Sequence, residues 1–157
     1  MVRYVVILLT LVGVTLFASS DAHAIVGVSV KLGAGVIRNN GVPGGMAAVE
    51  LGPLSPFVEV FRKSGATTFN MGGNLMFKLP LPLVKPYGGA GGGISRISGG
   101  GTSDSHGLFD LVAGADVKLP GTAGLFAQVK YFYTFGNGAF VVRDVAFQAG
   151  VVFGLGI

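Results

Sequence analysis

The sequence contains no cysteine, and this absence excludes several classes of protein at once. Without thiols, the chain cannot be a disulfide-stabilised scaffold, hold a thiolate zinc site or use a cysteine nucleophile. Charge is also scarce, because only 11% of the 157 residues are charged, less than half the share of about 25% that soluble globular domains carry. Half of the residues are hydrophobic, which excludes a disordered chain, since disorder requires low hydrophobicity and high net charge.

The positive balance of the chain does not indicate a nucleic-acid-binding protein. Eleven Lys and Arg residues outnumber seven Asp and Glu residues, which gives a formal net charge of +4. The basic residues are thinly spread, however, and no cluster is larger than the pair Arg62-Lys63. Because a nucleic-acid-binding face needs a concentrated basic patch, we expect no nucleic acid among the partners.

Residues 1–24 have the pattern of a secretory signal peptide. Arg3 supplies a positive start, residues 5–17 form an uncharged apolar stretch, and Ala22-His23-Ala24 places small residues at a cleavage site. The apolar stretch is shorter than the roughly 20 residues that a membrane-spanning helix needs. The sequence therefore predicts an exported protein whose mature domain comprises residues 25–157.

From Ile25 onward, apolar residues alternate with small or polar ones at a period of two, which is typical of β-strands with one apolar face. The segment 86–98 is too rich in glycine to be phased, but it has the length and position of a strand. The eight predicted strands are 26–36, 45–52, 56–63, 69–79, 86–98, 107–119, 125–135 and 144–157. Most have 8 to 13 residues, which is closer to the 9–11 or so of membrane-spanning strands than to the 5–6 or so usual in soluble sheets.

The predicted connections form two chemically different sets. Three alternate connections, around residues 53–56, 80–86 and 120, hold six of the seven prolines, and we call their end of the barrel the proline-rich rim. Proline cannot donate to a strand ladder, so it belongs at strand ends. The other four connections are polar and rich in glycine, and they define the polar rim: 38–44, 64–68, 99–106 and 136–143. With the N-terminus on the periplasmic side, the proline-rich rim faces the periplasm.

Alternation alone does not decide whether the apolar face points to lipid or, as in a soluble lipocalin-like carrier, to the interior. The other phase is mostly Gly, Ala, Ser and Asn with one or two charges per strand, which is unusually few charges for a water-facing exterior. It suits the lining of an eight-stranded barrel, whose interior is filled by side chains. Lipid contact requires a closed sheet without unpaired edges. We therefore predict an all-β fold, a closed antiparallel eight-stranded transmembrane β-barrel.

Aromatic residues near the strand ends indicate two weak interfacial girdles, although the chain has no tryptophan. One level contains Phe69, Phe109, Phe135 and Phe147, and the other contains Phe77, Tyr87 and Phe153.

Two short motifs make the chain resemble the small eight-stranded outer-membrane β-barrels of Gram-negative bacteria, the OmpA/OmpX/OmpW-like group. The stretch from Lys85 to Gly93 is similar to a Pro-Tyr-x-Gly-x-Gly segment in one inner strand of that group. The last strand ends in Gln148-x-Gly150-x-x-Phe153-x-Leu155, which is similar to the assembly signal that such barrels present to the outer-membrane insertion machinery. Leu155 stands where an aromatic residue is common, and two residues follow it. The resemblance implies an outer-membrane location and names no activity.

The interior phase predicts a polar network that fills the lumen, since a buried charge is tolerated only when it is paired. The alternative is a narrow porin-like path for small or hydrophobic molecules. The residues expected in the network are Lys31, Glu50, Glu59, Lys78, Asp110, Asp116, Lys118, Gln128, Lys130 and Gln148.

Catalysis is a weaker hypothesis. Some barrels of the group are lipid A-modifying enzymes, and His106 has Ser103, Asp104 and Ser105 as immediate neighbours in a predicted loop. Side chains of four consecutive loop residues rarely converge into a nucleophile–base–acid set, so we predict no catalytic residue, metal ligand or cofactor.

The partners that the predicted outer-membrane location implies are the lipid bilayer, lipopolysaccharide and the insertion machinery. Basic residues near the polar rim are placed to meet lipopolysaccharide phosphates: Arg38, Arg62, Lys63 and Arg143. The oligomeric state is not encoded in any motif.

Overall fold

The computed structural model describes residues 27–39, 41–135 and 143–155, and the predicted signal peptide lies outside them. No helix among these residues is long and apolar enough to cross a membrane. The strands are β1 (Val28–Ile37), β2 (Val42–Leu51), β3 (Leu54–Lys63), β4 (Ala66–Lys78), β5 (Val84–Gly99), β6 (Thr102–Lys118), β7 (Ala123–Phe135) and β8 (Arg143–Leu155).

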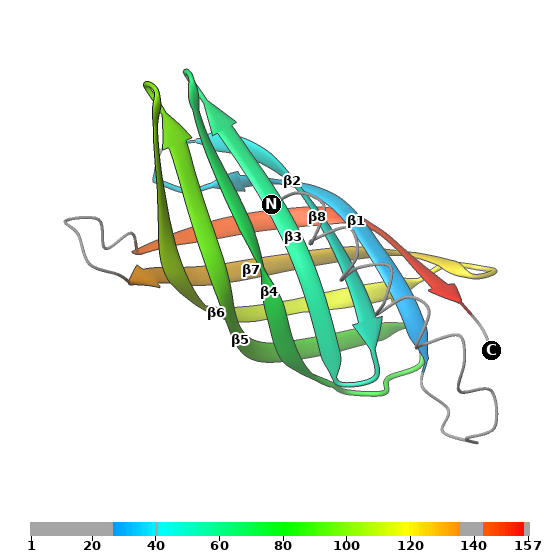
Figure 1. Cartoon of the computed structure of the whole chain (residues 1–157). Coiled ribbons are helices and arrows are strands. Elements are labelled where there is room, and N and C mark those ends of the chain that lie inside the picture. The colour runs from blue at the N-terminus through cyan, green and yellow to red at the C-terminus, as the bar shows by residue number, and fades with distance from the viewer. Residues whose placement is uncertain (1–26, 40, 136–142, 156–157) are drawn as a thin grey trace.

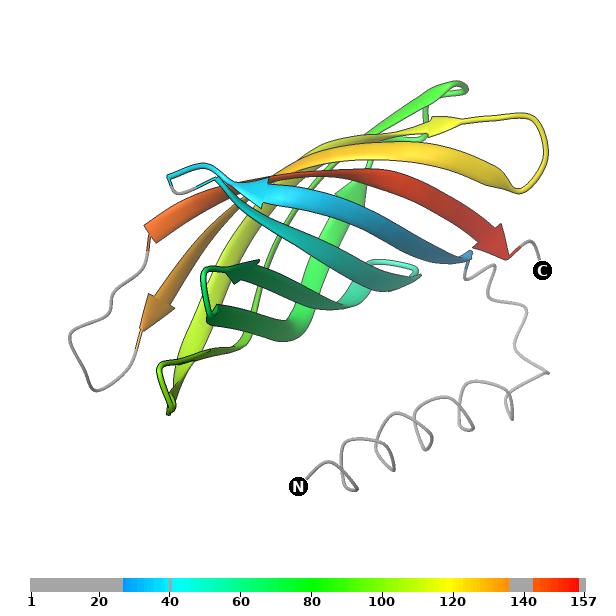
Figure 2. The ribbon, with the colours of Figure 1, turned by 90° about the horizontal axis from the view of Figure 1, so that it is seen from above.

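Each strand pairs antiparallel with the next one, and β8 pairs with β1, so the sheet closes into a barrel (Figure 1). The prediction of a closed, antiparallel, eight-stranded barrel is confirmed. The turns on the proline-rich rim and the end of β8 lie at one end of the barrel, and the tips of the β1–β2, β3–β4 and β5–β6 hairpins lie at the other (Figure 2).

The two phases of each strand face opposite sides of the barrel wall. Leu75, Val129 and Phe147 are exposed on the outer surface, whereas Lys31 and Glu50 are buried in the interior. This is the orientation that the scarcity of charge in the sequence predicted, and it leaves a large apolar outer surface.

The hairpins at the polar rim are tighter than predicted. The β3–β4 turn is Ser64-Gly65 and the β5–β6 turn is Gly100-Gly101, where positive φ angles at all four residues allow the chain to reverse within two residues. The predicted loops 38–44, 64–68 and 99–106 were therefore too long, because residues 42–44, 66–68 and 102–106 belong to strands. The predicted loop 136–143 lies outside the described residues except for Arg143.

Three residues assigned to the proline-rich rim or its girdle lie elsewhere. Pro56 and Pro86 are the third residues of β3 and β5 rather than connection residues, positions close enough to a strand end to tolerate a missing donor. Tyr87 is buried in the lumen and is not part of an interfacial girdle.

Glycines on the inner face create room for large side chains that project across the lumen. A Cβ atom at Gly33 would lie 2.6 Å from Phe126 Cζ, and one at Gly114 would lie 2.8 Å from Tyr87 Cζ. Phe126 and Tyr87 are both buried. The high glycine content of the inner phase is thus a packing requirement of a narrow barrel.

Candidate functional site

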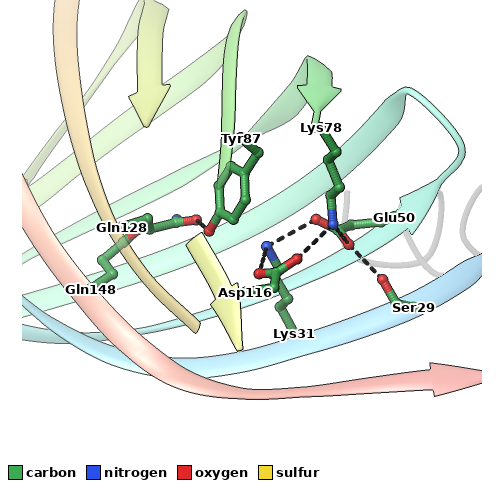
Figure 3. A network of polar contacts seen from close by, with 8 residues as sticks. All are labelled: Ser29, Lys31, Glu50, Lys78, Tyr87, Asp116, Gln128 and Gln148. Carbon is green, nitrogen blue, oxygen red and sulfur yellow. Dashed lines mark hydrogen bonds and ion pairs between the residues drawn. The ribbon is translucent and has the colours of Figure 1, made fainter. Parts of the chain in front are cut away.

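Four charged side chains close the interior near the proline-rich rim, and we call them the mouth cluster: Lys31, Glu50, Lys78 and Asp116. Lys31 Nζ lies 3.0 Å from Glu50 Oε1 and 2.7 Å from Asp116 Oδ1. Lys78 Nζ lies 2.6 Å from Glu50 Oε2 and 2.8 Å from Asp116 Oδ2. Ser29 also donates to Glu50 at 2.5 Å. Each ammonium group bridges both carboxylates (Figure 3). Because two positive groups face two negative groups, the cluster is electrically neutral.

A chain of hydrogen bonds leads from the mouth cluster toward the middle of the barrel. Lys31 Nζ lies 3.8 Å from the centre of the Tyr87 ring, which is cation–π distance. The Tyr87 hydroxyl donates to Gln128 at 2.8 Å, and Gln128 donates to Gln148 at 2.6 Å (Figure 3). Gln148 in turn donates to Glu59 Oε1 at 2.9 Å. Four strands are connected by this chain: β5, β7, β8 and β3.

A second group of polar side chains, the central cluster, surrounds Glu59 and consists of Glu59, Asn70, Asp110 and Lys130. Lys130 Nζ lies 3.0 Å from Glu59 Oε1 and 3.5 Å from Asp110 Oδ2. Asn70 donates to the other Glu59 oxygen at 3.3 Å. All four side chains are buried. One cation is therefore enclosed with two carboxyl groups and an amide.

The space left between the two clusters is small. A cavity of about 10 Å³ is lined by Lys31, Glu50, Glu59 and Lys130, and a single water molecule needs about 10–15 Å³. On the proline-rich side, an open vestibule of about 480 Å³ ends at Glu50, Lys78 and Asp116. Small solutes can enter the vestibule, but side chains fill the interior beyond it.

Nine of the ten predicted lumen residues take part in these contacts, and Lys118 does not. Lys118 is the last residue of β6, is exposed, and lines the vestibule. Its alternation phase is that of the lumen, but the strand ends before the side chain reaches the interior. The structure brings Asp116 to Lys31 and Lys78, and Lys130 to Glu59.

Several interior residues were missed at the sequence level. Asn74 and Ser95 are buried on the inner faces of β4 and β5. Within the described part of the chain, Asn74 Oδ1, Ser95 Oγ and His106 Nε2 have no hydrogen-bond partner. The alternation phase could have identified them, because uncharged polar residues in the inner phase indicate the lumen just as charged ones do.

The hypothetical catalytic residues do not lie in a loop, and that expectation was wrong. Ser103, Asp104, Ser105 and His106 belong to β6. Strand alternation turns the two serines to the outer face and the other two side chains toward the interior, where His106 is buried. No nucleophile–base pair forms from these residues. No group of three or more His, Asp or Glu side chains in the described ranges could hold a metal ion.

The residues of the motif at the end of β8, which resembles an assembly signal, lie in different environments. Gln148 is buried in the hydrogen-bond chain, Gly150 lies against the backbone of β1, and Phe153 is exposed on the outer face. Leu155 is the last residue of β8 and pairs with Val28.

Comparison with known proteins gives similarity at the level of structure. Neither a protein-family model nor a curated relative matches the sequence. Neisserial surface protein A matches with a TM-score of 0.57 at 20% identity, covering 81% of this chain and 95% of that one. The N-terminal β-barrel domain of Pseudomonas aeruginosa OprF matches with a TM-score of 0.61 at 13% identity, covering 83% and 98%. The chain therefore has the fold of the small eight-stranded outer-membrane β-barrels.

Proposed function

We propose that the protein is an integral outer-membrane β-barrel with a mainly structural role and a lumen closed by side chains. The observation that carries the proposal is the pair of buried charge clusters, which fill the interior of a barrel whose outer surface is apolar. A carrier needs an internal cavity for its ligand, and the cavity of about 10 Å³ between the clusters is too small for one.

The outer surface supports residence in a bilayer. Large apolar side chains are exposed on all eight strands, including Leu32, Leu54, Leu75, Leu111 and Leu125. In water such a continuous apolar surface would aggregate. In a membrane it contacts acyl chains, while the closed ladder leaves no backbone group unpaired at an edge.

The partners we propose follow from this location. Lipid and lipopolysaccharide surround the barrel, and the insertion machinery recognises the end of β8 through Gln148, Gly150, Phe153 and Leu155. The assignment of these four residues rests on the resemblance of the motif. We propose no enzymatic activity, because Ser103 and Ser105 point away from His106, and neither Ser95 Oγ nor His106 Nε2 has a hydrogen-bond partner in the described part of the chain.

A narrow path through the lumen is the second candidate function. The unpartnered polar atoms of Asn74, Ser95 and His106 favour it, since buried polar groups without protein partners usually bind ordered water. Such water would hydrate only the part of the lumen between the mouth cluster and the polar rim, because the mouth cluster closes the end toward the proline-rich rim.

Membrane fractionation combined with heat-modifiable gel mobility tests the main proposal. A closed transmembrane barrel is expected in the outer-membrane fraction, and unheated samples are expected to migrate differently from boiled ones because the barrel resists detergent at room temperature. Recovery of folded protein in the soluble periplasmic fraction would instead identify a carrier-like barrel and contradict the proposal.

A further inference from the structure

Arginines lie at the polar rim, whereas three of the lysines lie inside the barrel. Lys31, Lys78 and Lys130 are paired with carboxylates in the lumen. The arginines after residue 25 are all exposed and lie at or beside the polar rim: Arg38, Arg62, Arg96 and Arg143. Within the described residues, no arginine belongs to an ion pair. The rim therefore carries guanidinium groups that form no ion pair with a carboxylate of the described residues.

Two of these arginines and four hydroxyl side chains share one outward-facing patch that spans four neighbouring strands. Strand register aligns Arg62 of β3 with Thr67 of β4, then with Ser98 of β5 and Ser103 of β6. Arg96 lies one side-chain repeat below this row and pairs with Ser105. We call Arg62, Thr67, Arg96, Ser98, Ser103 and Ser105 the rim patch. The two hairpins that carry it rise side by side (Figure 1).

The hydrogen bonds of the patch hold Arg96 in place without using up its donors. Arg96 Nε donates to Ser103 Oγ at 2.8 Å, and Ser98 Oγ donates to the same oxygen at 3.1 Å. Both terminal NH₂ groups of Arg96 remain available. A guanidinium group fixed in this way is suited to bind a phosphate with two parallel hydrogen bonds, which a lysine ammonium cannot do.

The membrane-facing side of the patch is apolar. Phe69 is the cross-strand neighbour of Arg96, and Met71 and Ile94 form the next pair toward the middle of the barrel. All three are exposed on the outer surface. A ligand that fills the patch therefore meets cationic and hydroxyl donors at its upper end and apolar side chains directly below.

We propose that the rim patch binds the phosphorylated sugar headgroup of an outer-leaflet glycolipid whose acyl chains lie along Phe69, Met71 and Ile94. The Cα atoms of Arg62 and Arg96 are two strands and two residues apart, about 12 Å, so their side chains reach one headgroup from two sides. The inference rests on the proposed outer-membrane location, with the polar rim on the outside. A soluble anion, which has no acyl chains, would leave the apolar side chains of Phe69, Met71 and Ile94 without a ligand contact.

Native mass spectrometry of the full chain in detergent micelles tests the proposal, with diphosphoryl lipid A and its dephosphorylated form as probes. The variant R62Q/R96Q removes both guanidinium groups. K85Q/K118Q is the matched control, because it removes two exposed cations from the opposite end of the barrel. We expect wild type and K85Q/K118Q to bind diphosphoryl lipid A alike. R62Q/R96Q should bind about tenfold more weakly, the effect of losing charge-assisted hydrogen bonds.

Three outcomes would overturn the proposal. Equal affinity of R62Q/R96Q and wild type would remove the patch from the site. Equal binding of the dephosphorylated lipid would mean that acyl contacts alone retain it. Displacement of the lipid by millimolar inorganic phosphate would mean that the patch is a site for soluble anions. Heat-modifiable mobility of each variant is recorded in parallel, so that failure of the barrel itself is distinguished from failure of the site.

Discussion

The charged side chains of the two interior clusters lie next to opposite charges from other strands. In the mouth cluster, two ammonium groups and two carboxylates alternate. The central cluster is less balanced, since Lys130 is the one cation beside Glu59 and Asp110. Removing one member of a buried ionic group costs more than the group contributes as a whole, because the remaining charge stays desolvated. Substitutions in the central cluster should therefore lower the free energy of unfolding more than substitutions elsewhere in the interior.

Replacing Lys130 with Met is expected to lower the free energy of unfolding by about 3–5 kcal/mol, because Glu59 and Asp110 then face each other without a cation. Urea unfolding in detergent micelles measures the change. Lys118→Met is the control, since this exposed lysine makes no ion pair in the described structure, and it should leave the stability near that of wild type. The double variant K130M/D110N should recover part of the loss, and equal stability of K130M and K118M would contradict the argument.

Substitution of an inner-face glycine is expected to destabilise the barrel where the added Cβ atom has no room. Gly33→Ala places a Cβ atom 2.6 Å from Phe126 Cζ and 2.7 Å from the carbonyl oxygen of Ala149, so the β1–β8 pair must shift. Overpacking of this kind costs about 1–3 kcal/mol. Gly27→Ala is the matched control, because nothing lies within 4 Å of its Cβ position. Thermal unfolding should separate the two variants, and an unchanged midpoint for Gly33→Ala would show that the contact is easily relieved.

At the scale of strands, alternation was sufficient to predict seven strands and the face that each presents, whereas the glycine-rich segment 86–98 was predicted as a strand from its length and position. It failed where polar residues continue a strand above the apolar band, as in Ser103 to His106, because polarity at the end of a strand is indistinguishable from polarity in a loop. It could not place Tyr87, since an aromatic ring with a hydroxyl group suits both a girdle and a hydrogen-bonded lumen. Which charges would meet was also hidden, because the barrel brings Lys130 of β7 to Glu59 of β3 across the interior.

The β4–β5 turn has a composition that suits lipid rather than water. Leu79, Leu81 and Leu83 are all exposed, and they alternate with Pro80 and Pro82. The prolines have no N–H group, while Leu79 N donates to Pro86 O at 2.9 Å and Leu81 N donates to Leu79 O at 2.9 Å. A turn with so few free donors can enter an apolar layer at little cost. We infer that it anchors the proline-rich rim in the inner leaflet.

A single tryptophan tests this anchor, because the chain has none of its own. Leu81→Trp in liposomes should show blue-shifted fluorescence that is quenched by lipids brominated on their acyl chains. Ser103→Trp, at the tip of the β5–β6 hairpin, should instead be quenched by aqueous iodide. If Leu81→Trp is quenched by iodide as strongly as Ser103→Trp, the turn lies in water and the anchor is wrong.

At the scale of the whole molecule, the two charge clusters close the lumen in series. The mouth cluster lies at the base of the vestibule, the hydrogen-bond chain through Tyr87 and Gln128 follows, and the central cluster lies beyond it. Ions that pass one cluster still meet the other. Serial closure means that no single local opening connects the two rims.

Planar-bilayer recordings should therefore show small or no conductance for the wild-type barrel, because an ion would have to displace desolvated pairs that have no room to move aside. The variant E50A/K78A removes one carboxylate and one ammonium group from the mouth cluster and enlarges the vestibule, yet it should also lack large steps because Glu59, Lys130 and Asp110 remain in place. Large, stable conductance steps in wild type would reject the filled lumen and favour the narrow path. Large steps in E50A/K78A alone would show that the mouth cluster is the only barrier and that the central cluster is permeable.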